Sequence, residues 1–229
     1  MRSHNRALIA LALASAFVGI VLGVGALSHT KAVKLTGVGE ALSLYRGIPQ
    51  HANVLGSRTA PVTLVEYVDL QCPYCREFET QAMPALVERY VRTGRVRVEI
   101  RPLAFIGPDS VRGRNAIIAA GEQNRLFDLA QLLYENQQTE NTGWLDDRLV
   151  TKAAGSIPGL DVAKLLAARN SSAVARAASA FDAEATAAGV RSTPTVQVGK
   201  TGAALQTVAL SSPTDEQAVA AAIDAALRS

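Results

Sequence analysis

The two cysteines are the residues whose type and spacing could do chemistry, because Cys72 and Cys75 are the only ones among 229 residues and are separated only by Pro73 and Tyr74. Thiol–disulfide exchange needs an attacking thiolate and a second thiol close enough to resolve the mixed disulfide. A strand-like run over 62–70 ends before the pair and a helix is expected from Pro73, so the first sulfur should lie at a helix N-terminus, where a thiol pKa falls. The second thiol follows one helical turn later on the same face. We therefore predict that Cys72 and Cys75 are catalytic.

Two other uses of the cysteines are less well supported. A structural zinc site needs four ligands, and the chain adds only His4, His29 and His51, which are scattered along the N-terminal part. A purely structural Cys72–Cys75 bridge would close a very short loop, which gives little stabilisation. We expect neither a metal nor a separate cofactor, and the redox-active group would be the Cys72–Cys75 disulfide itself.

Glu66 is a candidate for proton transfer because it lies six residues before Cys72 on the same predicted strand. A carboxyl group among β-branched neighbours in a central strand should be buried and abnormally basic. It could then move the proton of the resolving thiol through water. The alternative is that Glu66 points to solvent.

Thr193 and Pro194 are candidates for substrate binding because they directly precede a predicted strand, Thr195–Val198. A trans bond would make them part of an ordinary turn. A cis bond would instead lay the backbone of residue 193 beside the cysteines, where it could pair with an extended substrate. The residues alone leave both isomers open.

The order of elements around these residues indicates an α/β fold. The run 95–103 alternates apolar and charged residues, as a half-buried strand does, so strand, helix and strand from 62 to 103 predict a parallel pair. Pro84 should kink or split the intervening helix. Helices alone follow, and then two strands and a last helix near 214–228, capped by Ser211 or Ser212. The five intervening helices are expected near 109–121, 124–137, 145–155, 161–169 and 172–188.

The N-terminal segment predicts export. Arg2 and Arg6 precede Ala7–Leu27, an uncharged run long enough to span a bilayer, so residues 1–6 should be a cytoplasmic stub and 7–27 an anchor. A cleavable signal with its cut near Val24-Gly25-Ala26 is the alternative. Residues 28–58 are interpreted as a linker and lead-in arm, in which a short edge strand could form. From residue 35 onward 19 basic residues face 20 acidic ones, so nothing indicates nucleic acid binding.

Several short motifs together resemble the DsbA-like exported oxidoreductases of the thioredoxin superfamily. The resemblance implies a thioredoxin fold, β-α-β … β-β-α, over residues 59–229, with an all-helical subdomain inserted at about 104–188. A thioredoxin without an insertion has no place for these helices. The matching motifs are Gly47-Ile48-Pro49-Gln50, Asn53-Val54-Leu55-Gly56, Ala60-Pro61-Val62-Thr63-Leu64-Val65-Glu66-Tyr67, Gln71-Cys72-Pro73-Tyr74-Cys75 and Gly189-Val190-Arg191-Ser192-Thr193-Pro194-Thr195.

The resemblance also implies a role for each position of the motifs. Cys72 would be the exposed nucleophile and Cys75 the shielded resolving thiol. Glu66 would be the buried acid beneath them, and Thr193 and Pro194 the cis-proline loop. Pro73 and Tyr74 would tune the redox potential. Pro-Tyr is not the Pro-His of strongly oxidising DsbA proteins, and threonine rather than valine precedes Pro194, which leaves the direction of electron flow open.

The exported context favours a dithiol oxidase that introduces disulfides into exported client proteins. A membrane thiol oxidase, linked to quinones, would reoxidise Cys72 and Cys75 after each turnover. The catalytic domain would be extracytoplasmic, either tethered by the N-terminal helix or released by cleavage. Two alternatives remain at this point: an isomerase or reductase kept reduced by a membrane electron donor, and a chaperone-like binding module without enzymatic activity.

Overall fold

The structure is a computed structural model that describes residues 33–229. The predicted anchor at 7–27 lies outside the described residues, and so does the stub before it. Within residues 33–229 no helix is both long and apolar enough to cross a membrane. Residues 35–229 form one compact unit, which contains both cysteines.

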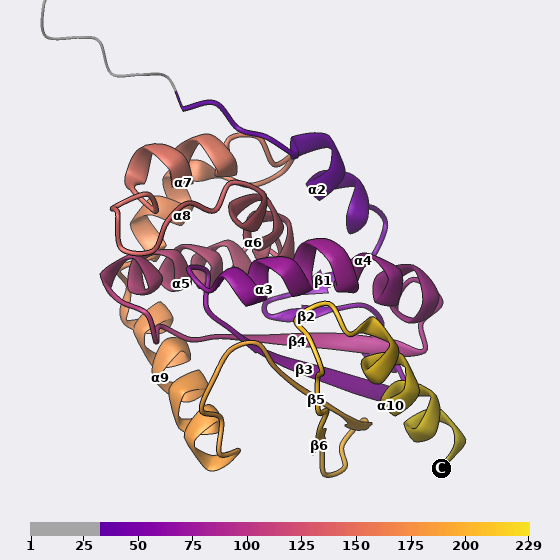
Figure 1. Cartoon of the computed structure of the whole chain (residues 1–229). Helices are drawn as coiled ribbons and strands as arrows, with labels where there is room; N and C mark the ends of the chain where they lie inside the picture. Colours follow the sequence, from indigo (N-terminus) through magenta and orange to yellow (C-terminus); the bar gives the residue numbers. More distant parts are fainter. Residues whose placement is uncertain (1–32) are drawn as a thin grey trace, which may run out of the picture. The chain divides into compact units, whose positions relative to one another are not determined.

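A six-stranded sheet of order β1-β2-β4-β3-β5-β6 is the centre of this unit (Figure 1). β3 and β4 are parallel, as predicted, and every other neighbouring pair is antiparallel. The central strands occur in the β-α-β … β-β-α order of a thioredoxin fold, which confirms the predicted fold class. The strands are β1 Gln50–His51, β2 Val54–Leu55, β3 Val62–Val68, β4 Val96–Pro102, β5 Thr195–Lys200 and β6 Gln206–Thr207.

The two faces of the central strand β3 are covered by different helices. All seven of its residues are buried. Val65 and Tyr67 pack with Leu103 and with Ala185 of the helix α9 (Ser172–Ala187). Because side chains alternate along a strand, Glu66 points to the opposite face, toward the helix that carries the cysteines.

The helix that carries the cysteines has two π-helical interruptions. It begins as α3 (Pro73–Glu77), passes through a π-helical turn at Phe78–Ala82, and continues as α4 (Met83–Leu86) and a second π-helical turn at Val87–Val91. The first turn directly precedes Pro84, whose missing N–H cannot continue the regular bonding pattern. The predicted disturbance at Pro84 is therefore confirmed.

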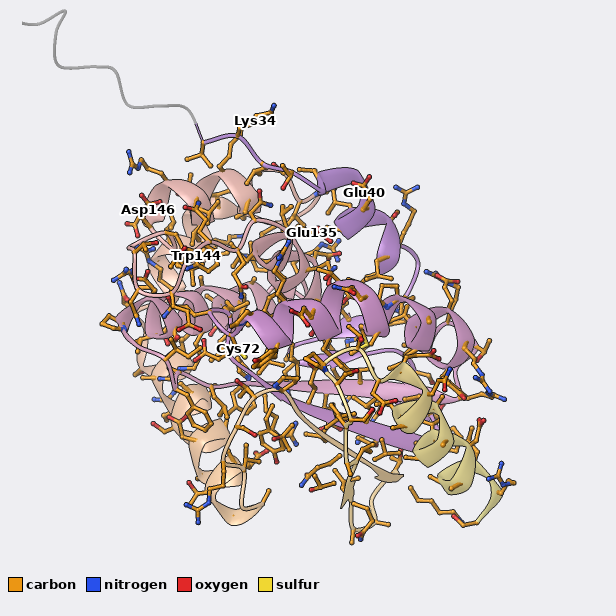
Figure 2. All side chains as sticks on the ribbon, viewed as in Figure 1. Lys34, Glu40, Cys72, Glu135, Trp144 and Asp146 are labelled. Carbon is orange, nitrogen blue, oxygen red and sulfur yellow. The ribbon has the colours of Figure 1, made fainter. Side chains whose placement is uncertain are left out.

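The predicted helical insertion is confirmed, with each expected helix present. Asp161 caps α8 and Ser171 caps α9. Figure 2 places Cys72 between this insertion, which carries Trp144 and Asp146, and the sheet. The insertion helices are α5 Pro108–Gly121, α6 Leu126–Glu135, α7 Asp147–Ala154, α8 Val162–Ala168 and α9.

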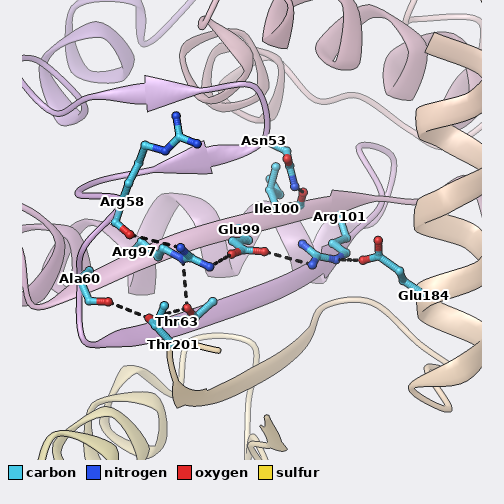
Figure 3. Close-up of polar contacts among 10 residues, drawn as sticks. All are labelled: Asn53, Arg58, Ala60, Thr63, Arg97, Glu99, Ile100, Arg101, Glu184 and Thr201. Carbon is cyan, nitrogen blue, oxygen red and sulfur yellow. Dashed lines mark hydrogen bonds and ion pairs between the residues drawn. The ribbon is translucent and has the colours of Figure 1, made fainter. Parts of the chain in front are cut away.

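Strand β4 has the predicted alternation, with Val96, Val98 and Ile100 buried. The charged side chains on its other face are partly covered and paired with one another (Figure 3). Glu99 lies between Arg97 and Arg101 along the strand, and Arg101 also contacts Glu184 of α9. The ion pairs therefore attach the end of the insertion to the sheet.

Two segments differ from the sequence-based expectation. The last helix, α10 (Glu216–Arg228), is capped by Asp215, whose side chain accepts a hydrogen bond from Ala218 N–H, so the expected cap at Ser211 or Ser212 was wrong. The segment expected to be a linker and arm contains a helix, α2 (Val38–Leu44), and the β1–β2 hairpin at the edge of the sheet. The three elements are short, and α2 and β2 contact parts of the chain that are distant in sequence, α6 and β4.

Candidate active site

The cysteine pair lies where β3 turns into α3. Cys72 is the N-cap of the helix and Pro73 occupies its first turn, where a missing N–H costs nothing. The Cys72 N–H donates to the Asp69 carbonyl at 3.0 Å, and the Cys72 carbonyl accepts from Arg76 N–H at 3.1 Å. Both cysteines are free thiols. The sulfur of Cys72 is thus held at a helix N-terminus, as predicted.

The two thiols differ in accessibility and in acidity. Cys72 is 5% exposed and Cys75 has no exposed surface. The Cys75 thiol, then the Thr193 hydroxyl and the N–H groups of Cys75 and Tyr74, hydrogen-bond to the Cys72 sulfur and lower its pKa to about 6, against the opposing effect of burial. Burial, followed by the hydrogen bond to Cys72, raises the pKa of Cys75 well above its usual value. Such a pair consists of one thiolate and one protonated thiol near neutral pH.

The exposed position expected for Cys72 needs correction. Most of the residue is covered, although it is more accessible than Cys75. In its protonated form the Cys72 thiol donates to the Thr193 carbonyl oxygen at 3.2 Å, and the Cys72 carbonyl accepts from the Gln137 amide at 3.0 Å. Pro73 and Tyr74, between the cysteines, are the exposed members of the motif.

The Thr193–Pro194 peptide bond is cis. The bond immediately precedes β5, which pairs antiparallel with β3 so that Thr195 lies opposite Tyr67. The register places the N-terminal end of β5 beside the C-terminal end of β3, and the chain continues from there to Cys72. The backbone of residue 193 is therefore next to the nucleophile, as the resemblance implied, although the two residues are 121 positions apart.

Glu66 is completely buried, as expected. Neither carboxyl oxygen has a hydrogen-bond partner among the described residues. Burial and the charge of nearby Glu79 raise the pKa of Glu66 well above its usual value. A carboxyl group in this environment favours its protonated form at neutral pH and can exchange a proton with a neighbouring group.

Glu79 is a buried acid that the sequence interpretation missed. It lies in the π-helical turn after α3, and burial raises its pKa, while contacts with Glu66 and Tyr45 oppose that effect. Its spacing offered a signal: Glu79 follows Cys75 by four residues, which puts both on one face of a helix. The carboxyl groups of Glu66 and Glu79 thus meet beneath Cys75, whose own pKa is raised in part by Glu66.

Metal ligation is not suggested by the geometry of the described residues. No group of three or more histidine, cysteine, aspartate or glutamate side chains in residues 33–229 is arranged to hold an ion. The cysteines themselves are engaged with each other and with Thr193.

Known proteins share this arrangement of sequence and fold. A family model described as "Thioredoxin" matches residues 50–225. A probable disulfide bond formation protein D of Bacillus cereus is 32% identical over 111 residues, which are 47% of this chain and 51% of that protein. The chain therefore spans about half the length of the curated relatives it matches.

Solved structures of other proteins have a similar fold. The oxidised crystal structure of BdbD from Bacillus subtilis superposes with a TM-score of 0.69 at 21% identity, over 80% of this chain and 98% of that one. A thioredoxin-like oxidoreductase from Silicibacter pomeroyi gives a TM-score of 0.61 at 25% identity, over 83% and 98% of the two chains. Since the family model covers most of the residues and the matching topology surrounds the cysteine pair, the chain belongs to the thioredoxin family.

Proposed function

We propose that this protein is a thiol–disulfide oxidoreductase that oxidises dithiols in exported client proteins. The observation that carries the proposal is the asymmetry of the cysteine pair. The pKa of Cys72 is lowered to about 6 and that of Cys75 is raised. A thiol of low pKa is a good leaving group, so Cys72 is released readily from a mixed disulfide when a second client thiolate attacks it, which completes oxidation of the client.

The proposed reaction begins from a disulfide between Cys72 and Cys75. A client thiolate attacks the Cys72 sulfur, the Cys72–Cys75 bond breaks, and Cys75 takes up a proton as it leaves. A second client thiolate attacks the client sulfur of the mixed disulfide and releases Cys72 as a thiolate. The client loses two electrons, and the cysteine pair gains them.

The neighbouring residues have complementary roles in this proposal. Glu66 supplies the proton to Cys75 through water, because its carboxyl group is buried and favours the protonated form. Thr193 and Pro194 hold the client backbone beside Cys72. Pro73 and Tyr74 tune the redox potential. The only cofactor in the scheme is the disulfide itself.

The setting of the reaction is proposed from the N-terminal sequence and from the relatives. The uncharged run after Arg2 and Arg6 would export the catalytic domain and either tether it or be cleaved off. Several relatives are described as disulfide bond formation proteins. A quinone-linked membrane thiol oxidase would reoxidise the pair, and cysteine-containing exported proteins would be the clients.

A second function, isomerase or reductase, is supported by Tyr74 between the cysteines and by Thr193 before the proline. A reductase moves electrons in the opposite direction and an isomerase works from the reduced pair, so the equilibrium potential against glutathione distinguishes these functions from an oxidase. We expect a value nearer the oxidising end of the family, about −120 mV, than the reducing end, about −270 mV. A reducing value, or a pair that is mostly reduced when trapped in cells by rapid alkylation, would favour the second function.

Trapping of clients tests whether the pair reacts with proteins at all. The Cys75→Ser variant should accumulate mixed disulfides through Cys72, because the resolving thiol is gone. The matched control Cys72→Ser should accumulate none and should be inactive. Full activity of Cys72→Ser would instead indicate a chaperone-like module that does not use the cysteines.

A further inference from the structure

A buried carboxylate outside the cysteine pair organises the turn that carries the nucleophile. Asp69 lies three residues before Cys72 and has no exposed surface. One carboxyl oxygen accepts from Gln71 N–H at 2.8 Å and from the Ser110 hydroxyl at 2.7 Å. The other accepts from the N–H groups of Phe105 at 2.8 Å and Ile106 at 3.1 Å. Four donors therefore converge on one side chain.

Further hydrogen bonds connect the same segments. The Gln71 amide donates to Ser110 Oγ at 3.0 Å and to Asn141 Oδ1 at 3.1 Å, and its oxygen accepts from Asn141 N–H at 2.6 Å. The Asn141 amide donates to the Ile106 carbonyl at 3.1 Å. The nucleophile turn, 69–72, is thus bonded to two loops of the insertion, 104–107 and 138–143.

One of these loops presents an apolar side chain to solvent. Phe105 is 51% exposed, and its N–H is one of the four donors to Asp69. The other large hydrophobic side chains exposed in the described part of the chain are Tyr74, between the cysteines, and Val111, which follows Ser110. Phe105 and Ser110, the neighbour of Val111, both donate to Asp69, and Tyr74 lies within the cysteine motif. The loop that carries Phe105 is therefore bonded to the turn that leads into Cys72, three residues after Asp69.

We propose that Asp69 is a positioning residue that fixes loop 104–107 against the nucleophile turn, so that Phe105 contacts an apolar client segment while its thiol reacts at Cys72. The proposal rests on the proposed thiol–disulfide function. Only a carboxylate suits the site, because every neighbour that bonds to it is a donor. An asparagine of the same shape has an NH₂ group in place of one carboxyl oxygen, and this group would face the donors on that side. The hydrogen bonds to either loop 104–107 or the nucleophile turn would then be lost.

A double-mutant cycle tests the proposal. The variants are Asp69→Asn, Phe105→Ala and the two combined, each prepared with the cysteine pair oxidised. The measured quantity is the ratio of two second-order rates, one for a reduced peptide with an apolar segment beside its cysteine and the other for glutathione. We expect each single variant to lower the ratio by about fivefold, a typical cost of one lost apolar contact. The combined variant should lower it no further, because both changes remove the same contact.

Two controls separate positioning from a general loss of structure. Asp128→Asn changes another buried carboxylate of the insertion, which accepts from the Gln50 amide and pairs with Arg125 rather than with loop 104–107 or 138–143, and should leave the ratio unchanged. Fluorescence of Trp144, the only tryptophan, reports whether the 138–146 region keeps its native environment in each variant. If Asp69→Asn does not fold, Ser110→Ala, which removes one donor, takes its place in the cycle.

The outcomes distinguish this inference from the proposed function. A wild-type protein that reacts with neither thiol would refute the function itself. A reactive wild type whose ratio is unchanged by Asp69→Asn, or whose two substitutions have additive effects on the ratio, would overturn the positioning role alone.

Discussion

Replacing Glu66 by glutamine should change how the stability of the reduced protein depends on pH. Glu66 is buried, its oxygens have no hydrogen-bond partner among the described residues, and its pKa is raised well above the usual 4.5. Above pH 4.5 the unfolded chain therefore releases a proton that the folded protein still holds. Stability must fall as pH rises through this window, because the unfolded state binds fewer protons.

The size of the change in slope follows from the titration of one proton. The free energy of unfolding should fall by about 1.4 kcal/mol per pH unit on account of Glu66, from pH 4.5 until the pKa of the folded state is reached. Glutamine has no such proton, so the curve of Glu66→Gln should be shallower by this amount. Its buried N–H groups cost about 1–3 kcal/mol where they lack an acceptor, and this cost does not depend on pH below about 7, where the neighbouring Glu79 carboxyl group ionises. The slope therefore tests the reasoning better than the stability at one pH does.

The assay is urea denaturation of the reduced protein at pH 5, 6, 7 and 8, with the m-value checked at each pH. Glu140→Gln, a substitution at an exposed position, is the matched control and should follow the wild type. Parallel curves for wild type and Glu66→Gln would refute a buried, neutral carboxyl group at this position.

The same variant tests the proton-transfer role. With glutathione attached to Cys72, the attack of Cys75 releases glutathione in a single turnover. If Glu66 accepts the Cys75 proton, Glu66→Gln should slow this release by at least about tenfold. An unchanged rate in a variant with the expected pH slope would leave Glu66 buried and basic but without a part in the reaction.

The other predictions concern the nucleophile and the packing of the insertion. Alkylation of Cys72 by iodoacetamide should rise with a midpoint near pH 6, and Cys75→Ala should move that midpoint upward, because the largest contribution to the lowered pKa comes from the Cys75 thiol; an unmoved midpoint would contradict this cause. Gly113→Ala should lower the free energy of unfolding by about 1–3 kcal/mol, measured by thermal denaturation. The new Cβ would lie 2.7 Å from Leu145 and 2.8 Å from Leu70. Gly39→Ala is the control, because no atom lies within 4 Å of its new Cβ, and it should not lower stability. Ser171→Ala should cost about 1 kcal/mol as the loss of a helix cap, while Ser172→Ala should not; equal effects would argue against the cap.

Much of the fold could be predicted from the sequence because its signals are local. The alternation of β4, the apolar run of β3 and the helices of the insertion depend on periods of two and 3.6 residues, which neighbours in the chain reveal. The position of Cys72 at a helix N-terminus follows from the strand before it and Pro73 after it. Helix α2 was missed, and only one short edge strand was considered where the β1–β2 hairpin lies. These elements are too short to show a period, and α2 and β2 depend on packing against α6 and β4.

The sequence by itself therefore determined which residues could do chemistry and in which element each lies. Tertiary structure decided which of them meet. The pairing of β5 with β3 brings Thr193 to Cys72, the packing of the helix after the cysteines on the sheet sets Glu79 against Glu66, and the docking of the insertion places three of the four donors around Asp69. Side-chain contacts across 36 to 121 residues depend on how whole elements pack, and no periodicity within one element encodes that. The cysteine pair could be recognised from the sequence, but the pKa values of its thiols and the residues that surround it depend on the fold.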